Sequence, residues 1–146
     1  MTELWRKTAR EMVALLAKGE VRPTEAVDAA AERIEATNGA VNAMVTLCLE
    51  RAKDAAALIE SKGHPENPGP GYLYGLPISV KDLNDVASVR CTLGSPIYAD
   101  RIATESDFMV QTLEANGAIV IGKSNTPEFG AGANTFNEVF GSTRNP

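Results

Sequence analysis

The stretch GLPISVKDLND, residues 75–85, contains a short apolar run that ends in Lys81 and Asp82. A run of this length, rich in Ile and Val and bounded by Gly and Asn, is typical of a strand. Side chains alternate along a strand, so we expect Ile78 and Val80 on one face and Lys81 on the other. Asp82 then points away from Lys81, which weakens a simple salt bridge between these neighbours.

A helix and a second strand are predicted downstream. TESDFMVQTLEANG (104–117) has a helical pattern, and AIVIG (118–122) is a second apolar run. Thr104 and Asp107 have the spacing of a capping box at the start of that helix. A strand, a helix and a strand joined in this way imply a right-handed crossover and neighbouring parallel strands.

The part upstream of residue 63 is predicted to be mainly helical. Apolar side chains recur at helical spacing up to Gly19, and again from an N-cap at Thr24 to Gly39. AMVTLCL (43–49) is short, apolar and partly β-branched, as a buried strand would be. A third helix is expected over residues 50–62.

The domain organisation follows from a break in composition. GHPENPGPGY (63–72) holds three prolines and three glycines, which indicates a loop. We therefore expect one α/β domain with an N-terminal helical region over 1–62, a linker over 63–74, and a mixed or parallel sheet flanked by helices starting in 75–146. The chain stops at Pro146 without a closing element, so we expect the front portion of a larger fold.

Composition excludes several classes of protein. The chain has 146 residues, 44% of them hydrophobic and 23% charged, which suffices for a core that needs no metal or disulfide to stabilise it. Its net charge is −5 and its basic residues form no cluster, so no nucleic-acid partner is indicated. No apolar run approaches the ~18 residues of a membrane span, and the charged N-terminus is not a signal peptide. A cytoplasmic setting without a membrane partner is expected.

Two features that could suggest a cofactor or a metal do not. Cys48 and Cys91 lack the spacing of a zinc site or a disulfide framework, so we expect no metal and two buried thiols. GAIVIGKS (117–124) fits the phosphate-loop pattern by its letters. Its central residues are the strand itself, so their amides would bond within a sheet and could not hold phosphate. We expect no cofactor.

Lys81 has two possible interpretations from the residues alone. A lysine at a strand end is most often a surface charge. A lysine that faces a packed interior is desolvated, which lowers the pKa of an amine from about 10.4 towards that of a useful base. Ser79 lies two residues away on the same face, ~6.6 Å by strand rise, which does not favour a serine–lysine dyad. His64 lies in the proline-rich loop, where we expect it to be exposed and outside any serine–histidine relay.

Three blocks closely resemble the amidase signature family. They are YGLPISVKDLNDV (74–86), TLGSP (92–96) and GAIVIGKSNTPEFGAGANTFNEVFGSTRNP (117–146), and they occur in the expected order. ERIEATNGAVNAMVT (32–46) is also similar to the N-terminal region of that family. The resemblance therefore extends over nearly the whole chain.

The resemblance implies an amidase that uses a serine–serine–lysine triad, with Lys81 as the general base. In the family, the neutral lysine accepts a proton through a bridging serine that is held by a cis peptide bond. The second serine attacks the amide carbonyl, and water or another amine then releases the acyl group. The substrate would be a small-molecule amide, and the choice between hydrolase and amidotransferase stays open.

This sequence contains only one of the three residues of the family's catalytic triad. Both serines follow the RNP block in the family, and the chain ends at Pro146 before either of them. Only Lys81 can therefore be carried over, and we expect the chain alone to be inactive, its partner being the remainder of an amidase chain or a second chain. The alternative is a non-catalytic scaffold or interaction module.

The segment EFGAG (128–132) corresponds to a stretch that lines the acyl pocket in the family. Gly130, Ala131 and Gly132 are the substrate-binding residues that the resemblance implies, because small residues allow a close approach to the backbone. The alternative is that the glycines serve a tight turn. In GKSN (122–125), Lys123 and Asn125 are expected to satisfy buried backbone groups.

Overall fold

The computed structural model describes residues 3–145, which form two compact units. Each unit is assembled from three stretches of sequence. The first unit contains the residues up to Ile34, Cys48–Ile78 and Thr112–Ile121, and the second contains Glu35–Leu47, Ser79–Gln111 and the residues from Gly122 onward.

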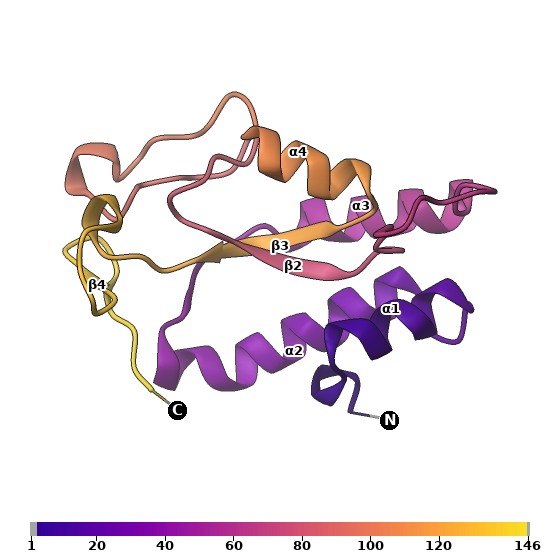
Figure 1. Ribbon diagram of the computed structural model, residues 1–146. Helices are drawn as coiled ribbons and strands as arrows, with labels where there is room; N and C mark the ends of the chain where they lie inside the picture. Colours follow the sequence, from indigo (N-terminus) through magenta and orange to yellow (C-terminus); the bar gives the residue numbers. More distant parts are fainter. Residues whose placement is uncertain (1–2, 146) are drawn as a thin grey trace. The chain divides into compact units, whose positions relative to one another are not determined.

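Helices and strands follow one another along the chain, as Figure 1 shows. The helices are η1 (Leu4–Arg6), α1 (Ala9–Ala17), α2 (Pro23–Val41), α3 (Leu49–Lys62), η2 (Pro96–Tyr98), α4 (Phe108–Ala115) and η3 (Glu128–Gly130). The strands are β1 (Met44–Leu47), β2 (Pro77–Lys81), β3 (Ile119–Ser124), β4 (Phe136–Asn137) and β5 (Gly141–Ser142).

The main sheet has three strands in the order β1-β3-β2. Strand β1 is antiparallel to β3, with a register irregularity between Met44 and Thr46. Hydrogen bonds from the Ile119 amide to the Leu76 carbonyl and from the Asp82 amide to the Ser124 carbonyl, each 2.9 Å, show that β2 and β3 run parallel. The predicted mixed α/β fold is therefore confirmed. Strands β4 and β5 form a separate antiparallel pair.

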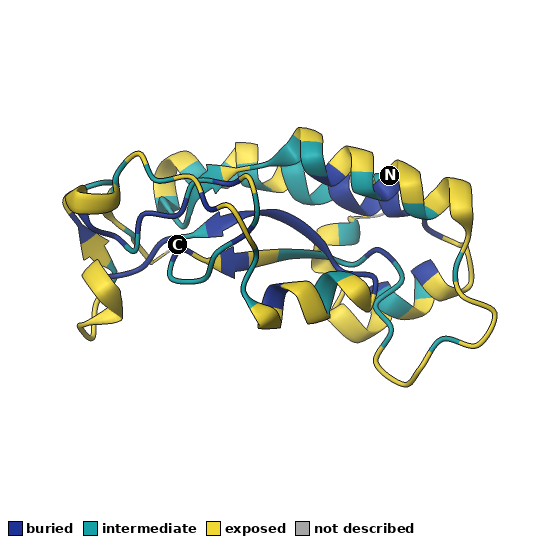
Figure 2. Ribbon diagram, turned by 90° about the horizontal axis from the view of Figure 1, so that it is seen from above, coloured by how far each residue is buried: buried dark blue, intermediate teal, exposed yellow. Residues whose placement is uncertain are grey.

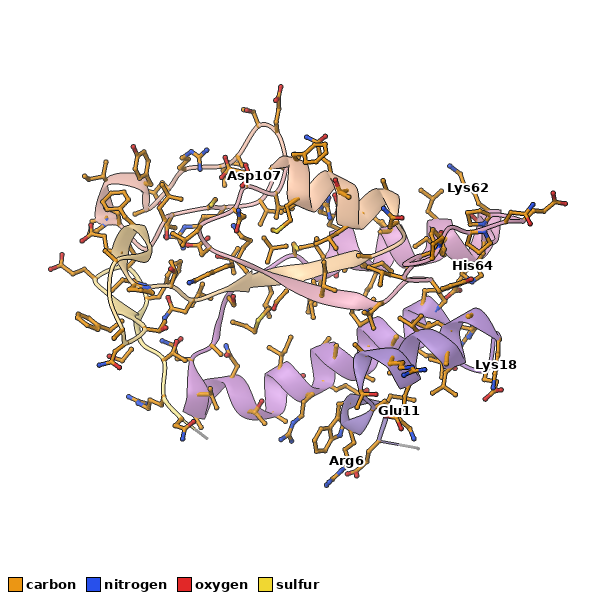
Figure 3. The ribbon with its side chains drawn as sticks, in the orientation of Figure 1. Arg6, Glu11, Lys18, Lys62, His64 and Asp107 are labelled. Atoms are coloured by element: carbon orange, nitrogen blue, oxygen red, sulfur yellow. The ribbon has the colours of Figure 1, made fainter. Side chains whose placement is uncertain are left out.

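The interior of the first unit is apolar. One cluster of its core consists of Met12, Leu16, Val21 and Ala26, against which Leu4, Leu15, Tyr74 and Leu76 pack. Helix α1 begins with a capping box in which Thr8 and Glu11 satisfy each other's backbone amides. Figure 3 shows Glu11 on α1 and Arg6 in the preceding turn. The guanidinium groups of Arg6 and Arg33 lie 4.5 and 4.1 Å from the ring centre of Trp5.

The loop between α3 and β2 contains a cluster of three rings. His64 packs edge to face against Tyr74 at 4.9 Å and Tyr72 at 6.1 Å between ring centres. Because of these contacts, His64 is half-buried, and the expectation of an exposed side chain was wrong. Figure 3 shows its position just beyond Lys62 at the end of α3.

Two predicted helix starts were wrong for tertiary reasons. Helix α2 begins at Pro23, whose fixed φ suits the first helical position, and the Thr24 hydroxyl donates to Glu60 at 2.7 Å instead of capping the helix. Helix α4 begins at Phe108, so Thr104 is not its cap. The Asp107 carboxylate, labelled in Figure 3, accepts hydrogen bonds from the Asn84 side chain and the Asp85 amide.

Residues 3–145 were also compared with the requirements of a membrane span and of a metal site. None of the helices within 3–145 is long and apolar enough to cross a membrane. Over the same residues, no three His, Cys, Asp or Glu side chains gather into a metal-binding group.

Candidate active site

The second unit contains Lys81 at the carboxyl end of β2. Lys81 is exposed, whereas the next residue, Asp82, is fully buried. The Asp82 amide extends the ladder by donating to the Ser124 carbonyl, so the alternation of strand side chains separates the two charged groups. The prediction that Asp82 points away from Lys81 is confirmed. Among residues 3–145, the buried lysine is Lys123, whereas Lys81 is exposed.

The Asp82 carboxylate is held by two buried partners. Its Oδ1 atom lies 3.2 Å from Nζ of Lys123, which is itself fully buried. Its Oδ2 atom accepts hydrogen bonds from the Thr92 hydroxyl at 2.6 Å and the Thr92 amide at 3.2 Å. Charge-assisted bonds of this kind offset the cost of burying both ions.

The TLGSP block forms a loop that joins Asp82 to the segment after β3. The Thr92 hydroxyl accepts from the Gly94 amide at 3.0 Å, and the Ser95 hydroxyl donates to Glu128 Oε1 at 2.7 Å. The Phe129 amide donates to the Leu93 carbonyl at 2.7 Å. The loop therefore positions the turn that leads into residues 130–132.

Gly94 is required where these two segments meet. Its φ is +67°, and a Cβ atom at this position would lie 3.0–3.2 Å from backbone atoms of Thr126, Pro127 and Glu128. Both the backbone conformation and the close approach therefore favour glycine.

The predicted acyl-pocket residues Gly130, Ala131 and Gly132 are all exposed. Gly130 has φ +73°, and a Cβ atom there would meet a methyl group of Leu83 at 2.8 Å. The structure therefore brings Gly130 against the turn that begins at Lys81. The positive φ values of Gly130 and Gly132 support the tight-turn interpretation, and the contact with a substrate stays a prediction.

Buried amides support the same segment from the interior. The Asn137 side chain donates to Asn125 Oδ1 at 2.7 Å and to the Thr126 carbonyl at 2.8 Å. The Asn125 Oδ1 atom accepts from the buried Thr126 amide at 3.0 Å, which confirms that Asn125 satisfies a buried backbone group. The same prediction for Lys123 was wrong, because its partner is the side chain of Asp82.

Two titratable groups lie close to the buried ion pair. The guanidinium group of Arg101 holds the pKa of Asp85 below its usual value through side-chain hydrogen bonds. Burial raises the pKa of the Cys91 thiol, which donates to the carbonyls of Asp82 and Asn84. A thiol with a raised pKa is a poor nucleophile, so Cys91 fits a structural role.

The phosphate-loop pattern is confirmed to be a strand. Residues Ile119–Ser124 form β3, which is almost entirely dark blue in Figure 2 because five of its six residues are buried. Lys123, which would reach a phosphate in a nucleotide-binding loop, is engaged by Asp82.

Sequence reasoning missed the ion pair between Lys123 and Asp82. One signal was present: a lysine that directly follows the apolar run AIVIG needs an acidic partner, and Asp82 follows the neighbouring parallel strand. The role of Thr92 has no comparable local signal, since its contact depends on the path of the loop.

Comparisons with known proteins agree with this architecture. The amidase family model matches residues 25–146. An acylamidase of Rhodococcus erythropolis is 37% identical over 140 residues, which make up 95% of this chain and 29% of that protein. A glutamyl-tRNA(Gln) amidotransferase subunit of Salinispora tropica is 37% identical over 149 aligned residues, covering all of this chain and 30% of that protein.

A solved structure shows the same likeness in three dimensions. A bacterial aryl acylamidase of the amidase signature family has a TM-score of 0.84 and 29% identity, covering 95% of this chain and 29% of that one. The chain thus spans 29–30% of the length of these relatives. Because the family match covers most of the sequence and the fold agrees, this chain belongs to the amidase signature family.

Proposed function

We propose that Lys81 is the general base of an amidase that hydrolyses small carboxylic amides through an acyl-enzyme. The observation that supports this is the buried pairing of Asp82 with Lys123 and Thr92. Because the neighbouring carboxylate is engaged on the other side of the strand, it does not tie the Lys81 amine into a surface salt bridge.

The proposed reaction begins with proton transfer to the neutral amine of Lys81. A bridging serine gives up its proton to Lys81 and takes one from a nucleophilic serine. The nucleophile forms a bond to the amide carbon, and the proton passes to the departing nitrogen as the C–N bond breaks. Water then attacks the acyl-enzyme, releases the acid and restores the serine.

The two serines and the oxyanion-hole amides would come from the rest of a complete amidase or from a second chain. This chain spans 29–30% of its relatives, which supports such a division. The same polypeptide would cover the exposed Lys81, and desolvation favours the neutral amine that a base requires. On its own, the chain would then be inactive.

The exposed segment of Gly130, Ala131 and Gly132 would contact the acyl part of the substrate. Small side chains there leave room for a substrate to approach the backbone. The proposed mechanism uses no cofactor or metal, and a cytoplasmic setting is proposed with it.

A second candidate is the transfer of an amide nitrogen in place of hydrolysis. It is favoured by the Salinispora tropica amidotransferase subunit, which is as similar to this chain as the acylamidase is, at 37% identity. Both reactions share the acyl-enzyme, so Lys81 would have the same role in each.

Mutation of Lys81 in the complete protein tests the proposal. We expect Lys81→Ala to lower amide turnover by about 10²–10⁴-fold, the range for loss of a general base. Lys53→Ala, at an exposed position on α3, is the matched control and should retain wild-type activity. Turnover is followed as ammonia or amine release from aryl, aliphatic and peptide amides, and the nucleophilic serine by fluorophosphonate labelling.

The outcomes separate the candidates. Full activity in Lys81→Ala would contradict its role as the base. A complete wild-type protein with neither turnover nor a labelled serine would instead support a scaffold or interaction module. Ammonia release in water indicates hydrolysis, whereas amide formation on a glutamyl-tRNA acceptor indicates transfer.

A further inference from the structure

We infer that the buried Asp82–Lys123 pair, together with Thr92, is a positioning device that orients Lys81 and cancels the carboxylate charge beside it. This inference rests on the proposed role of Lys81 as the base. Asp82 and Lys123 do not touch the reacting atoms in the proposed mechanism, so they are positioning residues.

The direction of Lys81 follows from the anchoring of Asp82. Successive side chains on an extended strand point to opposite faces. Asp82 is fixed inward by Lys123 at 3.2 Å and by the Thr92 hydroxyl at 2.6 Å. The Lys81 side chain is therefore held on the exposed face, and its own carbonyl accepts from the Asn84 amide at 3.0 Å.

The anchor also ties Lys81 to the predicted acyl-side segment. Thr92 belongs to the loop whose Leu93 carbonyl binds the Phe129 amide at 2.7 Å. Phe129 is followed by Gly130, which lies against Leu83 in the turn after Lys81. Loss of the Thr92 contact would therefore disturb both sides of the candidate site.

The charges around the pair are accounted for among the described residues. Asp85 is paired with Arg101, and the Cys91 thiol has a raised pKa and is neutral at physiological pH. Lys123 is thus the cation that balances Asp82. Without it, an unbalanced carboxylate next in sequence to Lys81 would favour the charged form of the Lys81 amine, which cannot accept a proton.

The first test removes the hydroxyl of Thr92 without changing any charge. We expect Thr92→Val in the complete protein to lower kcat by about 10- to 100-fold with KM little changed, because a displaced base slows the chemical step. Thr92→Ser retains the hydroxyl and should restore most of the rate. Equal kcat values for Thr92→Val and the wild type would overturn the positioning role.

The second test measures how the charges of Asp82 and Lys123 affect the pH of the acidic limb of the kcat/KM profile. Lys123→Met leaves Asp82 unbalanced and should move the limb to higher pH, whereas Asp82→Asn leaves Lys123 unbalanced and should move it to lower pH. The double variant leaves neither charge buried, so it should fold and return the limb to the wild-type position, with a reduced kcat. A limb that moves in the same direction in both single variants, or in the double variant, would contradict charge balancing.

The single variants are not required to fold for the inference to be tested. Thr92→Val and the double variant remain measurable if either single variant is lost. If Lys81→Ala loses activity while Thr92→Val and the double variant keep wild-type kcat, the inference fails and the proposed function stands. If Lys81→Ala keeps its activity, the proposed function fails, and the inference fails with it.

Discussion

Both units have buried apolar side chains, but their interiors differ in buried polar groups. The buried side chains of the first unit are apolar, and they include Met12, Leu16, Val27 and Ile119. Within residues 3–145, every buried polar or charged side chain belongs to the second unit, namely Asp82, Thr92, Ser95, Lys123, Asn125, Thr126 and Asn137.

This difference indicates that apolar contacts stabilise the fold, whereas buried polar contacts fix the positions of the segments in the second unit. Apolar contacts are non-directional, so a core of this kind stabilises a fold while tolerating changes of shape. Buried polar groups require partners in defined directions, and a network of them fixes the segments that it joins. The second unit, which contains Lys81 and residues 130–132, is the one with the directional interior.

The largest expected effect is the loss of stability in Lys123→Met, compared with a methionine substitution in the first unit. Lys123→Met removes one partner of a buried ion pair and should lower the free energy of unfolding by about 3–5 kcal/mol, because Asp82 is left as an uncompensated charge. Leu16→Met, in the apolar core, should cost less than about 1.5 kcal/mol. Urea denaturation of both variants measures the two values.

A double variant sharpens this contrast. Asp82→Asn combined with Lys123→Met removes both charges, and we expect it to recover most of the stability that the single variant loses. Equal losses for Lys123→Met and Leu16→Met would mean that the two interiors do not differ in their tolerance.

A smaller difference in stability is expected when either of two glycines with nearly the same backbone conformation is replaced by alanine. Gly19 in the first unit has φ +69° with no atom within 4 Å of an added Cβ, whereas Gly94 in the second has φ +67° and backbone atoms at 3.0–3.2 Å. Gly19→Ala should cost about 1–2 kcal/mol from backbone strain alone. Gly94→Ala should cost about 1–3 kcal/mol more because of overpacking, and thermal or urea unfolding would show it. Equal costs would show that the segments around Gly94 yield to the extra methyl group.

The smallest expected effect is the pH dependence of the Asp85–Arg101 pair. Arg101 lowers the pKa of folded Asp85 below its unfolded value of about 3.9, so the pair stabilises the fold fully above that pH. This contribution is lost as the pH falls through the lowered folded pKa. The Arg101 side chain is 36% exposed and the Asp85 side chain 23% exposed, so Arg101→Gln should cost no more than about 1 kcal/mol at pH 7.

Unfolding measured from pH 7 to pH 2 would check this sign. The stability difference between the wild type and Arg101→Gln should shrink below about pH 4. Lys53→Gln, at an exposed helical position, is the control and should show no such convergence. A difference that grows as the pH falls would contradict the assignment.

Much of the fold could be predicted from sequence because its signals are local. The apolar runs of β2 and β3 and the amphipathic pattern of α3 correspond to elements close to the expected residues. Helix ends could not be predicted as well from sequence, because they depend on groups that are distant in the chain. The Thr24 hydroxyl bonds Glu60 and the Asp107 carboxylate bonds the Asp85 amide, and neither partner is evident from the local sequence.

The candidate site was predictable only in part. Alternation along β2 was enough to place Lys81 and Asp82 on opposite sides. The partners of Asp82 were not predicted, because Lys123 is 41 residues away in the chain and Thr92 approaches through an irregular loop. Periodicity describes single elements, whereas these contacts depend on how β3 and the loop that contains Thr92 lie beside the end of β2.

The contact of the Trp5 ring with two arginine side chains provides an optical reporter. Trp5 is the single tryptophan of the chain and lies in the apolar first unit, so its fluorescence reports the folding of that unit. Circular dichroism, in contrast, records the helices and strands of both units. If loss of the Lys123–Asp82 pair unfolds the second unit alone, the dichroism will change while the tryptophan emission stays native, and the two transitions will no longer coincide.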